Sequence, residues 1–206
     1  MSEAAPVTLT LSDALWPAAT TSESKALPWL RNGALVIGGV ALMTIGAKLS
    51  FNTALSPGVP ISMQSFAVLV IGMVLGWRLA ASSVASYLAL GLAGAPVFAN
   101  LGAGPVYFMG PTGGYLLGFL AAAALVGYLA ERGFDRTMSR SLIAMAAGTA
   151  VIFVPGVLWY SNWLGGNLSH AYDMGLLIYL PGEVIKIILA AAVLPAAWKF
   201  AGRKRG

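Results

Sequence analysis

The stretch GLLIYLPGEVIKIILAAAVLPAAW, residues 175–198, is an apolar run long enough to cross a bilayer, yet it holds two opposite charges. A spanning helix needs roughly 20 mostly apolar residues. On a helix, Glu183 and Lys186 lie on one face because they are three positions apart. A charge at the bilayer centre costs about 2.5–3.5 kcal/mol on insertion scales, and such charges usually face the bundle interior and mark a function. The stretch therefore predicts a membrane helix with a functional charged pair.

The composition of the whole chain is typical of a membrane protein. Of its 206 residues, 58% are hydrophobic and 9% are charged, whereas roughly a quarter of the residues of a soluble domain are charged. Cysteine is absent and His170 is the only histidine. Because catalytic zinc needs about three protein ligands, we expect no metal site. We also expect no cofactor.

Apolar segments of spanning length recur along the chain, so we expect an all-α integral membrane protein. The six transmembrane helices are expected near residues 33–50, 62–77, 79–95, 113–131, 140–160 and 175–199. The second and third are nearly contiguous around Gly76-Trp77-Arg78, which predicts a tight helical hairpin.

The segments at the two ends of the chain are polar. Residues 1–32 form an N-terminal tail, with a short surface helix expected around Leu11 to Trp16, and residues 200–206 form a basic tail. Residues 33–199 make up the six-helix domain. The tail lacks the basic start and apolar middle of a secretory signal, so we expect it to be retained and cytoplasmic.

Basic residues fall almost entirely on one face of this six-span arrangement. Lys48 is the exception at the other face, and the following lie on the shared face: Lys25, Arg31, Arg78, Arg132, Arg136, Arg140, Lys199, Arg203, Lys204 and Arg205. The positive-inside rule then predicts that both termini are cytoplasmic. The net charge of +5 is thus explained by topology, and we expect no nucleic-acid partner.

The loop between the third and fourth spans, Gly94 to Gly118, contains no charged residue. A long solvated loop is normally polar, so we expect this glycine-rich loop to fold back as an extracytoplasmic lid. Asn100 and Tyr115 provide hydrogen-bonding groups of the kind that a pocket for a small, partly polar ligand requires. A plain connector is the alternative. The loop lacks the Lys-Ser/Thr ending of a phosphate-binding loop, which argues against a nucleotide.

Three interpretations of the Glu183–Lys186 pair are open. The pair can be a structural ion bridge, Lys186 can extend toward the membrane surface, or the two groups can bind a ligand that offers both donors and acceptors. Pro181 and Gly182 interrupt the apolar run just before the pair, and this break favours the ligand-binding interpretation.

Four segments in order along the chain resemble the signature segments of the BioY family of biotin transporters. They are VPISMQSFAVLVIGMVLG (Val59 to Gly76), GLAGAPVFANLGAG (Gly91 to Gly104), GPTGGYLLGFLAA (Gly110 to Ala122) and LPGEVIKI (Leu180 to Ile187). Members of this family are substrate-binding S components of energy-coupling factor (ECF) vitamin importers. This chain has Glu183 where aspartate is common in the family, and the extra methylene changes the expected geometry of the pocket.

The resemblance implies biotin capture from outside the cell membrane, by a protein that is not an enzyme. It also implies partners, namely a transmembrane coupling protein and two ABC ATPases, with lipid around the helices. Matching positions imply that biotin is bound by Glu183, Lys186, Asn100, Tyr115 and Gln64. Ala34 and Gly38 have the small-xxx-small spacing that lets membrane helices approach closely, so we expect them to contact the coupling protein.

Other classes of function are weighed against this one. An S component or a secondary transporter for another small vitamin-like solute is the main alternative, with Glu183 as a proton relay in the second case. An intramembrane serine protease requires a serine–histidine geometry, and His170 lies in an expected loop. Whether the chain forms a homo-oligomer is open.

Overall fold

The computed structural model describes residues 10–17 and 26–203; the expected tail residues 1–9, 18–25 and 204–206 lie outside this part. Its main elements are helices. In chain order they are α1 (Leu11–Leu15), α2 (Ala26–Lys48), β1 (Ser50–Phe51), β2 (Ile61–Ser62), α3 (Gln64–Leu92), the 3-10 helix η1 (Ala99–Leu101), α4 (Gly104–Phe108), α5 (Gly113–Ala130), α6 (Met138–Trp163), α7 (Leu168–Tyr172), the π-helix η2 (Asp173–Leu177) and α8 (Leu180–Arg203).

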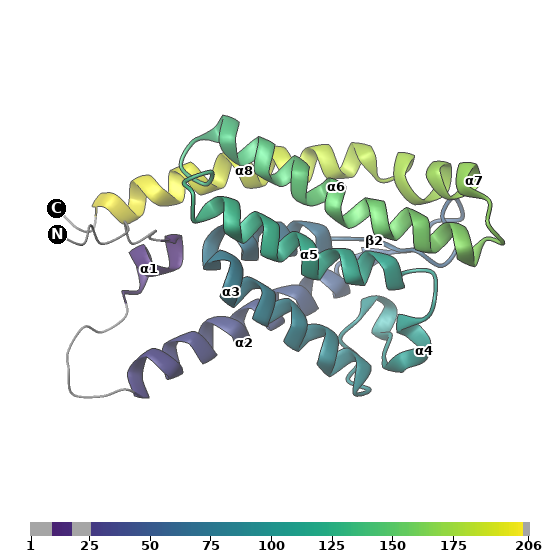
Figure 1. Ribbon diagram of the computed structural model, residues 1–206, viewed down its shortest axis with the longest axis horizontal. Helices are drawn as coiled ribbons and strands as arrows, with labels where there is room; N and C mark the ends of the chain where they lie inside the picture. The colour runs from purple at the N-terminus through teal and green to yellow at the C-terminus, as the bar shows by residue number, and fades with distance from the viewer. Residues whose placement is uncertain (1–9, 18–25, 204–206) are drawn as a thin grey trace, which may run out of the picture.

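Five of the described helices are long and apolar enough to cross a membrane. They are Pro28–Lys48 in α2, Gln64–Leu92, Gly113–Ala130, Met138–Trp163 and Leu180–Ala201 in α8. Helix α5 packs against both α3 and α6, while α2 packs on α3 and α8 on α6 (Figure 1). The two short strands form an antiparallel pair, with Ser50 opposite Ser62, at the start of α3.

The break expected near Gly76 is present within α3. Gly76 has φ 76° and ψ 172°, which is not helical. A positive φ of this kind is cheap only for glycine. The chain changes direction at this residue, and the two parts of α3 leave it at an angle (Figure 1). The structure therefore has one broken helix where two short, nearly contiguous spans, near residues 62–77 and 79–95, were expected.

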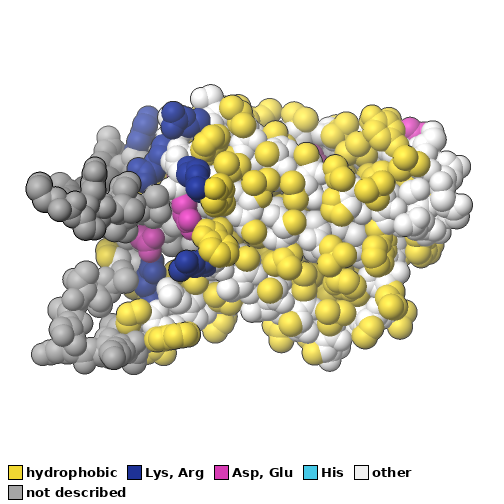
Figure 2. All heavy atoms as spheres, viewed as in Figure 1, with side chains coloured by type: hydrophobic (Ala, Val, Ile, Leu, Met, Phe, Trp, Pro, Cys, Tyr) yellow, Lys and Arg dark blue, Asp and Glu magenta, His cyan; other side chains and the backbone are white. Residues whose placement is uncertain are grey.

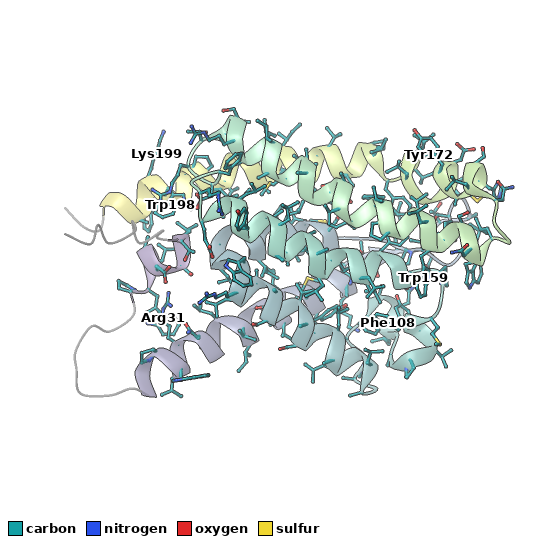
Figure 3. The ribbon with its side chains drawn as sticks, viewed as in Figure 1. Arg31, Phe108, Trp159, Tyr172, Trp198 and Lys199 are labelled. Carbon is teal, nitrogen blue, oxygen red and sulfur yellow. The ribbon has the colours of Figure 1, made fainter. Side chains whose placement is uncertain are left out.

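Charged side chains gather at one end of the bundle (Figure 2). Arg31, Trp198 and Lys199 lie at this end, and Phe108, Trp159 and Tyr172 lie at the other (Figure 3). Two polar contacts tie separate elements together at the charged end. The Glu131 carboxylate accepts from the backbone N–H of Trp77 at 3.1 Å, and the indole of Trp198 donates to Asp135 at 2.5 Å.

Helix α1 also lies at the charged end. Thr10 caps it through a capping box with Asp13. Asp13 in turn forms a 2.8 Å salt bridge with Arg31 of α2. Leu11 is buried in a cluster that includes Leu194 and Ala201 of α8. Helix α1 therefore contacts α2 near its first turns and α8 near its last turns.

At the opposite end, the segment between α3 and α5 packs onto the bundle. Phe98 is fully buried, with its ring edge-on to Tyr87 at 5.4 Å and stacked on Tyr107 at 5.1 Å. The ammonium of Lys48 donates to the carbonyls of Pro96 and Phe98. These contacts give Lys48 a structural role, because its positive charge is attracted to the carbonyl oxygens of the loop.

Replacing Lys48 with methionine is expected to loosen residues 94–102. Amide hydrogen exchange in this segment should become roughly tenfold faster, because hydrogen bonds from a charged donor are stronger than neutral ones. Hydrogen–deuterium exchange with mass spectrometry measures this change. Lys48→Arg keeps the donor and serves as the matched control. Unchanged exchange in Lys48→Met would show that Lys48 does not hold the loop.

Candidate functional site

A small cavity lies between the apolar helices and the loops of the end opposite the charged one. Its volume is about 50 Å³, which is room for a few water molecules. The lining residues come from the segment before α3, from α3 to α6 and from α8: Val59, Pro60, Ser62, Gln64, Ser65, Tyr107, Thr112, Tyr115, Leu116, Phe119, Ile152, Phe153, Tyr179 and Glu183. The walls are mostly aromatic and aliphatic, with a few polar groups, as in pockets for small molecules.

Glu183 and Lys186 form an ion pair, which is one of the three interpretations that the sequence left open. Lys186 Nζ lies 2.7 Å from Glu183 Oε1, and both residues are buried, with exposed fractions of 3% and 8%. Pro181 lies in the first turn of α8, where proline is tolerated because its missing N–H has no helical partner. Glu183, also in this turn, is stabilised by the positive end of the helix dipole.

The ammonium of Lys186 is fully occupied within the protein. Its acceptors are Glu183 Oε1, the Ser62 carbonyl at 2.6 Å and Ser65 Oγ at 3.1 Å, and an ammonium has three donors. A ligand oxygen can reach Lys186 only by replacing one of these acceptors. Glu183 Oε2, in contrast, is buried and has no hydrogen-bond partner within the described part of the chain. An unpaired buried acceptor costs free energy, and a ligand N–H would recover that cost.

Gln64 and Tyr87 form a second polar group beside the charged pair. The Gln64 amide donates to the Tyr87 hydroxyl at 2.9 Å, and that hydroxyl donates to the Val97 carbonyl at 3.1 Å. The Ser62 hydroxyl donates to Gln64 Oε1 at 3.3 Å. Gln64 is thereby held in one orientation at the cavity wall.

Tyrosine hydroxyls fasten the segment between β1 and β2 over the cavity. The Tyr179 hydroxyl donates to the Val59 carbonyl at 2.6 Å and lies 2.5 Å from Ser56 Oγ. The Tyr160 hydroxyl donates to the Pro57 carbonyl at 3.0 Å. A ligand much larger than a few waters therefore requires a wall to move, and this segment is attached by only a few side-chain bonds.

One tyrosine of α4 and one of α5 also reach the cavity. Tyr107 of α4 lines it, and burial raises the pKa of this phenol above its ordinary value, so it stays a neutral hydroxyl at physiological pH. The Tyr115 hydroxyl donates to the Gly175 carbonyl at 2.7 Å. Tyr115 thus presents mainly the body of its ring to the cavity.

The structure brings together four of the five expected ligand residues. Gln64, Tyr115 and Glu183 line the cavity, and Lys186 bonds to Glu183. Asn100 does not line it: this residue is exposed, has φ 54°, and donates to Asn52 at 2.9 Å. No group of His, Asp and Glu side chains able to hold a metal occurs among residues 10–17 and 26–203.

The two residues expected to contact a partner lie elsewhere. Ala34 and Gly38 line a shallow apolar groove between α2 and α3, with a volume of about 210 Å³. A side chain added at Gly38 would meet no atom within 4 Å, so this face of α2 is open.

Several lining residues were missed in the sequence. Tyr179 lies four residues before Glu183 and therefore on the same helix face, so helical spacing could have identified it. Ser65 directly follows Gln64, and no pattern in one sequence distinguishes it from the other serines. Phe153 and Thr112 reach the cavity only through the packing of α5 on α6.

The chain matches known proteins over most of its length. The model of the BioY family matches residues 18–203. A biotin transporter BioY of Thermotoga maritima is 35% identical over 74% of this chain and 87% of the relative. One of Rhizobium etli is 36% identical over 65% and 74% of the two chains. The crystal structure of the S-component for biotin from an ECF-type ABC transporter superposes with a TM-score of 0.76 at 25% identity, covering 88% of this chain and 95% of that one.

Proposed function

Since this chain belongs to the BioY family, we propose that it captures biotin at the cavity beside Glu183 and serves as the substrate-binding component of an ECF-type importer. The observation that carries the proposal is the buried carboxylate oxygen of Glu183 that lacks a partner, next to a fully bonded ammonium. The chain binds its ligand without transforming it, so it is a transport component and not an enzyme.

The chemistry of biotin suits this arrangement. Its ureido ring offers two N–H donors and one carbonyl, its sulfur ring is apolar, and its side chain ends in a carboxylate. Glu183 Oε2 accepts from a ureido N–H, and Lys186 meets a ligand oxygen in exchange for one of its present acceptors. Gln64 adds a further hydrogen bond. Tyr115 and the neighbouring aromatic walls cover the apolar ring.

Ligand entry requires rearrangement at the loops. The cavity of about 50 Å³ must widen, and the wall that moves in this proposal is the segment between β1 and β2, which side-chain bonds from Tyr160 and Tyr179 hold in place. Asn100 takes part only if its segment also moves, because its amide now bonds Asn52. Residues 94–118 then act as the lid over the bound ligand.

Calorimetric titration of the purified protein with biotin and a panel of other vitamins tests the function. We expect saturable binding of biotin alone. Binding of a different vitamin would instead identify an S component for that solute. Uptake in cells that lack every coupling ATPase, abolished by a protonophore, would indicate a secondary transporter. Absence of binding to biotin would reject the proposed function.

For topology, we propose that the two parts of α3 on either side of Gly76 act as two membrane legs, which makes six. Arg31 and Lys199 lie at the same end of the bundle (Figure 3), where Lys and Arg side chains gather (Figure 2). By the positive-inside rule, this supports the proposal that the charged end faces the cytoplasm and that both termini are cytoplasmic. The cavity with its loops faces the outside.

We further propose that α2 contacts the coupling protein through Ala34 and Gly38, with the two ATPases bound to that partner. The groove at these residues lets another helix approach closely. Replacing Gly38 with leucine should reduce copurification of the coupling protein at least about fivefold, while biotin binding stays unchanged. Ile37→Leu, at an exposed position of the same helix, is the control. Full retention of the partner by Gly38→Leu would contradict this contact.

A further inference from the structure

Ser65 links the first turn of α3 to the charged pair of α8. Its hydroxyl donates to Glu183 Oε1 at 2.8 Å and accepts from Lys186 Nζ at 3.1 Å. With the 2.7 Å contact between Lys186 and Glu183, the three side chains close a ring of hydrogen bonds. Ser65 is buried, with 6% of its surface exposed, and lines the cavity together with Glu183.

The ring treats the two carboxylate oxygens of Glu183 differently. Oε1 accepts from both Ser65 and Lys186, whereas Oε2 has no partner among the described residues. A hydroxyl has a single proton to donate, and Ser65 uses its proton on Glu183. Ser65 therefore has no proton left for a ligand, so its effect on a ligand passes through the carboxylate.

We propose that Ser65 is a positioning residue for ligand recognition: it fixes the Glu183 carboxylate so that Oε2 alone remains as acceptor for one ligand N–H. This inference rests on the proposed function and adds a residue to it. The side chain of Glu183 has more rotatable bonds than aspartate, so it needs more restraint to present one oxygen. Lys186 restrains the carboxylate along α8, and Ser65 restrains it from α3. Fixing the acceptor before binding lowers the entropy cost of binding.

Ser65→Ala tests the inference by competition against radiolabelled biotin. The variant should bind biotin about tenfold more weakly, the effect expected when a hydrogen bond to a charged group is removed. The second ligand is a biotin with one ureido nitrogen methylated, tried with each nitrogen in turn. Methylation of the nitrogen that faces Glu183 should strongly weaken binding to the wild type. In Ser65→Ala the same methylation should cost several-fold less affinity, because Glu183 is no longer held in one position.

Ser83→Ala is the matched control. Ser83 is a fully buried serine of the same helix, bonded to the Leu79 carbonyl at 2.8 Å and outside the cavity. It should keep wild-type affinity for both ligands. Unchanged biotin affinity in Ser65→Ala would overturn the inference. So would a methylation penalty equal to that of the wild type, which would indicate that Ser65 only supports the fold.

The two levels of the proposal fail in different ways. If the wild type does not bind biotin, the proposed function fails, and the same variants are then compared on whichever vitamin of the panel binds. If the wild type binds biotin but Ser65→Ala behaves like Ser83→Ala, only the role of Ser65 fails.

Discussion

Replacing Lys186 with methionine is expected to destabilise the protein and to abolish ligand binding together. The change leaves the buried carboxylate of Glu183 without its cation, and an unpaired charge in such a place costs about 3 kcal/mol or more. The melting temperature of the detergent-solubilised protein should fall by several degrees. Biotin affinity should fall roughly 100-fold, because a bond to a charged group is lost and the carboxylate is no longer held.

The double variant Glu183→Gln with Lys186→Met separates the two effects. It removes both charges, so most of the lost stability should return, as it does when a buried ion pair is replaced by neutral groups. Ligand binding should not return, because the ammonium is gone and a neutral amide, a weaker acceptor, replaces the carboxylate. Thermal unfolding and titration calorimetry on the same samples measure the two quantities. A single variant Lys186→Met with the stability and affinity of the wild type would contradict the role of the pair.

Local sequence patterns predicted the parts of the molecule that depend on neighbours in the chain. The apolar runs predicted helices long enough to span a membrane, and i,i+3 spacing predicted that Glu183 and Lys186 share one face of α8. Gly76 was expected to interrupt the chain, and it does. These features follow from side-chain periodicity and backbone freedom, which a single sequence displays.

Features that depend on contacts between distant segments could not be predicted. Ser65 meets Glu183 across 118 positions of the chain, and Tyr179 bonds Val59 across 120. The expected role of Asn100 came from its polar side chain in an uncharged loop and from the resemblance, whereas its bond to Asn52 depends on how two loops meet.

The packing of α5 on α6 depends on two glycines of α5. A Cβ atom at Gly118 would lie 2.7 Å from the Ile152 carbonyl oxygen, and one at Gly114 would lie 2.4 Å from that of Pro155. Both obstacles are backbone atoms of α6, which cannot turn aside as a side chain can. Small residues four positions apart let membrane helices approach in this way. Tyr115, between the two glycines, and Phe153 of α6 line the cavity, so this contact also shapes the site.

The double variant Gly114→Ala with Gly118→Ala is expected to push α5 away from α6. Overpacking costs about 1–3 kcal/mol per site, so the pair should lower the free energy of unfolding by roughly 2–6 kcal/mol and abolish biotin binding through displacement of Tyr115. Gly33→Ala is the control, since a Cβ there meets no atom within 4 Å and alanine favours the helix by about 0.5–1 kcal/mol. Thermal unfolding and calorimetry again give both quantities. If the double variant matched Gly33→Ala in stability and in affinity, the close approach of α5 to α6 could not be what shapes the pocket wall.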